Sequence, residues 1–100
     1  MVLTMLGAKI DLEKNTAQGR IDAVIELTKH IYITEFKYTG SEAGASETDR
    51  KHKMDSLLDS AIQQIRVSHY ADAYLNSNKK TMLLGVGFVD KEIGVRLVVG

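Results

Sequence analysis

Alternating apolar and polar residues predict three consecutive strands in the first part of the chain. Residues 8–14 alternate, residues 20–27 are rich in β-branched side chains, and residues 30–38 form a third segment of the same kind. Because the links between these segments are short, we expect an antiparallel meander. Residues 1–6 are expected to be the last turns of a helix that ends at Gly7.

The second half of the chain predicts a loop, a helix and two further strands. The stretch 39–53 is polar and rich in small residues, which is typical of a mobile loop, although its second half could already be helical. Residues 80–89 are almost continuously apolar, as in an interior strand covered on both faces, and residues 93–99 predict a final strand. A helix precedes these strands, with Ser56 and Asp59 spaced like a capping box. Its apolar stripe consists of Met54, Leu57, Leu58, Ala61, Ile62 and Ile65.

The connection from 30–38 through this helix to 80–89 is long enough for a crossover, which would make those two strands parallel. The expected fold class is therefore α/β, with a mixed sheet that joins an antiparallel meander to a parallel strand. A chain of 100 residues predicts a single domain over residues 1–100.

One face of the predicted strand 30–38 begins apolar and ends charged. That face carries Ile31 and Ile33, followed by Glu35 and Lys37. A buried charge is costly unless another group compensates it. The two charged residues therefore need partners.

A two-residue turn at Thr28 and Lys29 would place Asp22 opposite Glu35 on the neighbouring strand. Directly opposed carboxylates repel each other, whereas a divalent cation between them removes the repulsion, and Mg²⁺ takes carboxylate oxygens as ligands. Lys37 would then point toward whatever the metal holds. A register slip of one residue would send Asp22 to the other face.

Composition limits the function classes. The 13 basic and 13 acidic side chains cancel, so no broad positive field indicates a strong nucleic-acid binder. The chain has no cysteine, which excludes a disulfide scaffold and a thiolate metal cage. The apolar start is too short to span a bilayer, so we expect no membrane contact and a cytoplasmic location.

Several sequence blocks together resemble the PD-(D/E)XK nuclease superfamily, and in particular its bacterial branch often attached to an ATPase-like domain. These blocks are GRIDAVIE, IYITEFKY, AIQQI, YADAYL and KKTMLLGVGF, in this order along nearly the whole chain. The proline of the motif is absent, and Ile21 precedes Asp22 instead. Members usually have a longer first helix than this chain offers. The resemblance implies a restriction-endonuclease-like core flanked by helices.

The resemblance also implies metal-dependent hydrolysis of phosphodiester bonds, with DNA as the expected substrate. Asp22, Glu35 and the backbone carbonyl of Phe36 would hold Mg²⁺ or Mn²⁺. Glu13 on the first strand is a further candidate ligand, in place of an acid from the longer helix. These expectations assign the metal site to the first three strands.

Two more residues receive catalytic roles from the resemblance. Lys37 would steer the attacking water and stabilise negative charge in the transition state. Gln64 on the helix would orient a water or a nucleic-acid group.

Other interpretations of the same residues stay open. Asp22 and Glu35 could be exposed rim charges paired with Lys37 or Arg20, and the basic run 50–53 is better explained as a solvated loop than as a phosphate grip. The whole chain could also be a catalytically silent nuclease-fold module that acts in protein interaction or oligomerisation. A homodimer that covers apolar surface is one form of that alternative.

Overall fold

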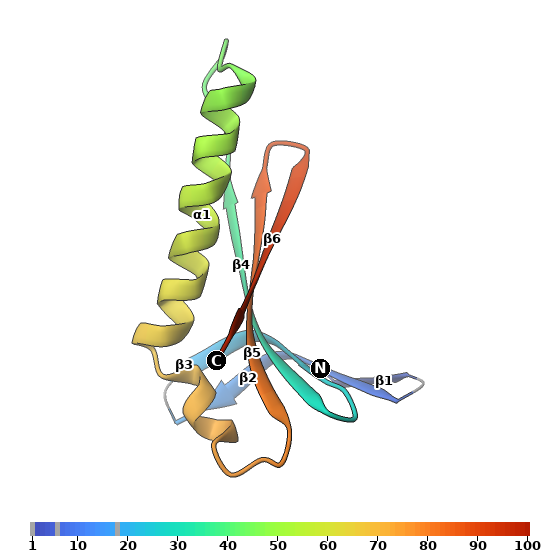
Figure 1. The fold of residues 1–100 in the computed structure, drawn as a ribbon. Coiled ribbons are helices and arrows are strands. Elements are labelled where there is room, and N and C mark those ends of the chain that lie inside the picture. Colours follow the sequence, from blue (N-terminus) through green and yellow to red (C-terminus); the bar gives the residue numbers. More distant parts are fainter. Residues whose placement is uncertain (1, 6, 18) are drawn as a thin grey trace.

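The computed structural model describes residues 2–5, 7–17 and 19–100, which form a six-stranded sheet with one long helix on one of its faces (Figure 1). The strands lie in the order β1-β2-β3-β4-β5-β6. The elements are β1 (Val2–Met5), β2 (Ala8–Thr16), β3 (Gly19–Glu26), β4 (His30–Thr39), α1 (Glu47–Val67), the 3₁₀ helix η1 (Tyr70–Tyr74), β5 (Lys80–Val89) and β6 (Glu92–Val99). No helix in the described part of the chain is long and apolar enough to cross a membrane.

The predicted mixed sheet is confirmed. Strands β2, β3 and β4 form the antiparallel meander, and β4 pairs with β5 in parallel after a connection that contains α1. The final strand β6 is antiparallel to β5 and forms one edge of the sheet. One α-helix, rather than several, flanks the sheet among the described residues, together with the short η1.

The prediction of a helix over residues 1–6 is wrong. Val2–Met5 form the strand β1, which pairs with residues 8–11 of β2 across a turn at Gly7, while residues 1 and 6 lie outside the described part. Gly7 has a φ of +75°, a conformation that glycine adopts without strain. Five apolar residues show no clear period, so only pairing with β2 distinguishes strand from helix here.

The predicted capping box is wrong, whereas the alternative that the second half of 39–53 is helical is confirmed. Residues 47–53, predicted to belong to a loop over 39–53, are the first turns of α1, which leaves residues 40–46 as the connection. The capping box is formed by Ser46 and Asp49 rather than by Ser56 and Asp59, since the Ser46 hydroxyl accepts from the Asp49 N–H at 3.1 Å. The first turns of α1 are polar, and Arg50 in them lies 3.6 Å from Glu92 at the start of β6, so the apolar stripe begins later than the helix.

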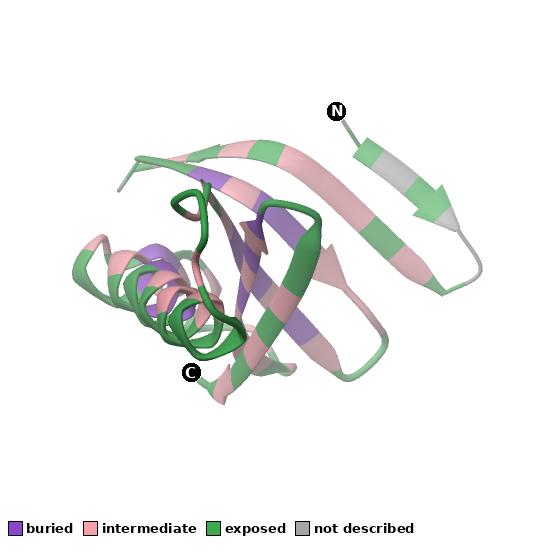
Figure 2. Ribbon diagram, turned by 90° about the horizontal axis from the view of Figure 1, so that it is seen from above, coloured by how far each residue is buried: buried purple, intermediate pink, exposed green. Residues whose placement is uncertain are grey.

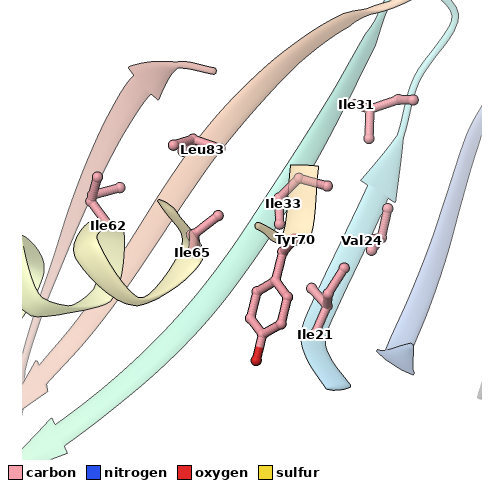
Figure 3. Close-up of a cluster of buried hydrophobic side chains, with 8 residues drawn as sticks. All are labelled: Ile21, Val24, Ile31, Ile33, Ile62, Ile65, Tyr70 and Leu83. Atoms are coloured by element: carbon pink, nitrogen blue, oxygen red, sulfur yellow. The ribbon is translucent and has the colours of Figure 1, made fainter. Parts of the chain in front are cut away.

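Three glycines let α1 approach β5 and β6 closely. A Cβ added at Gly85 would lie 3.1 Å from the Ala61 Cβ, and one at Gly87 or Gly94 would lie within 2.9 Å of the Met54 sulfur. Further along the helix, Ile62 and Ile65 join the buried cluster that Figure 3 shows between α1 and the sheet. The cluster consists of Ile21, Val24, Ile31, Ile33, Ile62, Ile65, Tyr70 and Leu83.

Strand β5 is not covered on both faces, contrary to the prediction. Residues 83, 85, 87 and 89 are buried, but residues 82, 84, 86 and 88 between them are only half-buried. Figure 2 shows α1 on one side of the sheet, and the described residues form no second long helix that could cover the other side. A continuously apolar strand therefore has one face without a helix among the described residues.

Candidate active site

The candidate site lies where β3 and β4 separate. Their pairing follows the predicted register, with Ile25 opposite Tyr32 and Val24 opposite Ile33, and it ends at Ala23 and Thr34. Asp22 and Glu35 occupy the next positions in this register. Beyond this point β4 continues to Thr39 alongside β5, so the site forms beside a strand that has lost one neighbour.

Asp22 fills part of the gap between the two strands. Its Oδ2 accepts a hydrogen bond of 2.9 Å from the backbone N–H of Phe36. A side-chain oxygen thus replaces the backbone acceptor that a longer ladder would have supplied to β4. The same bond fixes the peptide before Phe36 relative to the carboxylate of Asp22.

Glu35 is a buried carboxyl group, and one of its two oxygens accepts a hydrogen bond. The residue is 4% exposed, and its Oε1 accepts a hydrogen bond of 2.7 Å from Gln64 Nε2. Its Oε2 is buried and has no hydrogen-bond partner among the described residues. Burial, together with the negative charge of Asp22, raises the pKa of Glu35 to about 7, against the opposing effect of Lys37. A buried oxygen without a donor indicates that a further group belongs beside it.

Gln64 connects the acid to the lysine. Lys37 Nζ donates to Gln64 Oε1 while Gln64 Nε2 donates to Glu35, so both ends of the amide are engaged. This orientation is the one that chemistry requires, because an ammonium only donates and a carboxylate only accepts. The sequence predicts that Gln64 contacts water or nucleic acid, whereas in the structure it holds the two protein groups at a fixed separation.

The interpretation of the acids as exposed rim charges does not describe this geometry. Glu35 is buried rather than exposed, and Lys37 contacts the amide of Gln64. Arg20 Nη1 lies 3.9 Å from Glu13 Oε1, and both side chains are mostly exposed. Arg20, which the sequence offered as a charge partner of these acids, is close enough to Glu35 to oppose the rise of its pKa.

Glu13 lies near the site but outside the central group. It lines a cleft of about 410 Å³ together with Asp22 and Phe36. Its backbone has a φ of +55°, an uncommon conformation for a residue within a strand. The described residues contain no cluster of three or more His, Cys, Asp or Glu side chains that could hold a metal. Glu13 as a ligand therefore stays a prediction.

The remaining oxygens suit a hard divalent cation. Asp22 and Glu35 offer two carboxylates, and one of their oxygens is buried without a donor. Mg²⁺ is commonly held by one or two carboxylates and keeps several of its waters, so a site of this kind does not need a complete protein cage. The donor set in the first half of β3 and in the middle of β4 therefore fits Mg²⁺ or Mn²⁺.

Comparison with known proteins identifies the family. A family model described as the PD-(D/E)XK nuclease superfamily matches residues 1–96. The chain belongs to this superfamily. The assignment of the motif to Asp22 on β3 and to Glu35, Phe36 and Lys37 on β4 stays a prediction from the sequence.

A relative of this PD-(D/E)XK chain occurs in Azotobacter chroococcum mcd 1, under the name "Uncharacterized protein in vnfD 5′region". The two sequences are 33% identical over 83 residues, which are 83% of this chain and 13% of the relative. The chain thus spans a small part of the relative's length. No solved structure gives a significant match.

Proposed function

We propose that the chain is a Mg²⁺-dependent nuclease-like domain that hydrolyses phosphodiester bonds, with DNA as its substrate. The observation that carries the proposal is the buried Glu35 oxygen without a donor, next to Asp22 and linked through Gln64 to Lys37. Strongly perturbed pKa values cluster at functional sites, and burial beside a second carboxylate is an arrangement that perturbs them.

Each residue has a separate role in the proposed reaction. Asp22, Glu35 and the carbonyl oxygen of Phe36 would hold Mg²⁺ or Mn²⁺, which supplies Lewis-acid polarisation of the scissile phosphate when bound. Phe36 lies within β4, where the N–H and the carbonyl of one residue point to the same edge of the strand, so the carbonyl of Phe36 faces the side on which Asp22 accepts the Phe36 N–H.

Lys37 provides positive charge where negative charge builds up. Its ammonium group lies on the same face of β4 as Glu35 and is held by Gln64, so little reorganisation is needed when a phosphate arrives. Gln64 acts as a positioning residue in this proposal. It keeps the ammonium and the carboxyl group apart and stops them from forming a direct ion pair.

Cleavage of plasmid and oligonucleotide substrates tests the catalytic role. Wild type is expected to cleave DNA in the presence of Mg²⁺ or Mn²⁺, and Lys37→Ala is expected to abolish cleavage because the charge on the transferring phosphate is no longer stabilised. Lys29→Ala, an exposed lysine in the turn before β4, is the matched control and should keep wild-type activity. If wild type cleaves no DNA or RNA under these conditions, the chain is better described as a silent module for protein interaction.

Metal binding is tested without a substrate, by thermal unfolding with and without Mg²⁺ or Mn²⁺. A ligand at a hundredfold excess over its Kd stabilises the folded state by about 2.7 kcal/mol, so the melting temperature of wild type should rise. Lys37→Ala should show nearly the same rise, because the lysine is not a ligand. Asp22→Asn should show little rise. Equal responses of wild type and Asp22→Asn would contradict the assigned ligands.

A further inference from the structure

Arg20 is a second cation beside the candidate site. It lies on β3, two residues before Asp22. Burial raises the pKa of Glu35, and the positive charge of Arg20 opposes this rise, as that of Lys37 does. The ammonium group of Lys37 is held by Gln64, and the proposed reaction already uses it. Arg20 is a cation near the acids that the proposed reaction does not yet use.

The ladder pairs of β3 leave out Asp22 toward both neighbouring strands. Toward β2, the pairs before and after this position continue the ladder, but none joins Glu13 to Asp22 among the described residues. Toward β4, the pairing ends at Ala23 and Thr34. Glu13 has a φ of +55°, which departs from strand geometry at the same point. The strands therefore separate around Asp22, and Glu13 and Arg20 are exposed beside this point.

The guanidinium group of Arg20 is held only loosely. Its Nη1 lies 3.9 Å from Glu13 Oε1, which is beyond hydrogen-bond distance, and the two side chains are 60% and 69% exposed. Arg50, in comparison, donates a hydrogen bond of 2.7 Å to the carbonyl oxygen of Ala45. An exposed ion pair without a hydrogen bond contributes little to stability. Arg20 can therefore exchange Glu13 for another anion at little cost.

A backbone phosphate is an anion that suits both the guanidinium group and the charges around it. A guanidinium group presents a planar set of donors that can bind two phosphate oxygens at once, whereas an ammonium group acts as a point charge. Glu13, Asp22 and Glu35 carry three negative charges when ionised, and Arg20 and Lys37 carry two positive charges. A divalent cation leaves this group with one positive charge, which matches the single negative charge of a phosphodiester.

The charge of the whole chain makes such a local contact necessary. Its 13 basic and 13 acidic side chains cancel, so the attraction for a phosphate must come from individual cations near the site. We propose that Arg20 binds a phosphate of the DNA backbone at the candidate site, and that Glu13 holds the guanidinium group until the DNA arrives. This proposal rests on the proposed nuclease function and gives the site a phosphate contact besides Lys37.

Fluorescence anisotropy of a labelled DNA duplex tests the proposal in metal-free buffer, where the proposed hydrolysis does not proceed. Arg20→Gln is expected to weaken binding about tenfold and to reduce the slope of log K against log salt concentration by about 0.9, the value for one phosphate contact. Arg20→Lys should keep the slope and lose less affinity, because it keeps the charge. Arg66→Gln removes an exposed arginine from the last turn of α1 and is the matched control, with wild-type affinity and slope.

A double-mutant cycle tests the exchange of Glu13 for phosphate. Glu13→Gln removes the anion that competes for Arg20, so the duplex should bind more tightly. This gain should disappear when Arg20 is also replaced by glutamine, because the two side chains then no longer interact. A gain of equal size in both backgrounds would show that Glu13 only repels the DNA, and it would overturn the exchange.

Three further outcomes would overturn the role of Arg20. These are a wild type that does not bind the duplex, an unchanged salt slope in Arg20→Gln, and equal losses of affinity in Arg20→Gln and Arg66→Gln. Urea denaturation should give the same midpoint for both variants, and a loss of stability confined to Arg20→Gln would indicate a structural ion pair instead. Cleavage by wild type together with binding that does not depend on Arg20 would refute this proposal alone. Binding that depends on Arg20 without any cleavage would refute only the hydrolysis.

Discussion

Replacing Glu35 by glutamine should change how the stability of the protein depends on pH. Glutamine resembles the protonated form of Glu35 and can accept the same hydrogen bond from Gln64, but it cannot ionise. In the folded protein the pKa of Glu35 rises from 4.5 to about 7 because the group is buried beside Asp22. The unfolded chain has no such environment.

The sign and size of the effect follow from that difference. Between pH 4.5 and about 7 the unfolded chain has lost the Glu35 proton while the folded protein still holds it, so raising the pH favours unfolding. The contribution of neutral Glu35 to stability is fully present below pH 4.5 and is lost as the pH rises through about 7. At about 1.4 kcal/mol for each pKa unit, the total is about 3 kcal/mol.

Urea denaturation of both proteins without divalent metal, from pH 4 to pH 8, measures this effect. Other carboxyl groups titrate in both proteins, so the informative quantity is the difference between their unfolding free energies. Glu35→Gln should match wild type at the acidic end and exceed it by up to about 3 kcal/mol at the alkaline end. Glu42→Gln, in the exposed loop before α1, controls for the loss of one carboxyl group. A difference that does not change with pH would refute the assigned environment of Glu35.

Two further substitutions test the helix and its packing by urea denaturation. Ser46→Ala should destabilise the protein by about 1 kcal/mol because it removes the cap of α1, whereas Ser56→Ala, on the exposed side of the helix, should have little effect. Gly94→Ala would place a Cβ 2.7 Å from the Met54 sulfur and should cost about 1–3 kcal/mol, part of which Met54→Ala should restore. Equal effects of the two serine changes, or no recovery in the glycine pair, would contradict these assignments.

The sequence predicts the hairpin register because local rules determine it. A two-residue turn at Thr28 and Lys29 leaves little freedom in which residues of β3 and β4 face each other, and the paired residues from Ala23 to Glu26 agree with the prediction. The observed pairing stops at Ala23 and Thr34, one position before Asp22 and Glu35, so the register brings the two acids near each other without pairing them. The hydrogen bond from the Phe36 N–H to Asp22 does not follow, because it depends on the point at which the strands separate.

The wrong predictions for α1, β5 and Gln64 have a common cause, because each of these features depends on contacts between residues far apart in the sequence. Ser46 and Ser56 each precede an aspartate by three residues, so either could form the capping box. The apolar stripe favours Ser56, but the stripe marks where α1 contacts the sheet and not where the helix begins. The apolar run 80–89 likewise does not reveal whether one face or both are covered, since both cases give the same pattern. The role of Gln64 between Lys37 and Glu35 depends on how α1 lies against β4, which no local pattern determines.

The separation of the site residues along the chain implies an order of assembly during folding. Asp22 and Glu35 meet through a hairpin with a two-residue turn, a contact of low sequence separation that forms on a timescale of about 1–10 μs in isolated hairpins. Gln64 reaches Glu35, and β5 pairs with β4, only when the long connection of residues 40–79 has folded so that α1 packs on the sheet. Contacts between residues so far apart in the sequence form more slowly. The two acids therefore meet first in water, where their repulsion is weak, and the electrostatic strain of the site develops only as the helix closes over them.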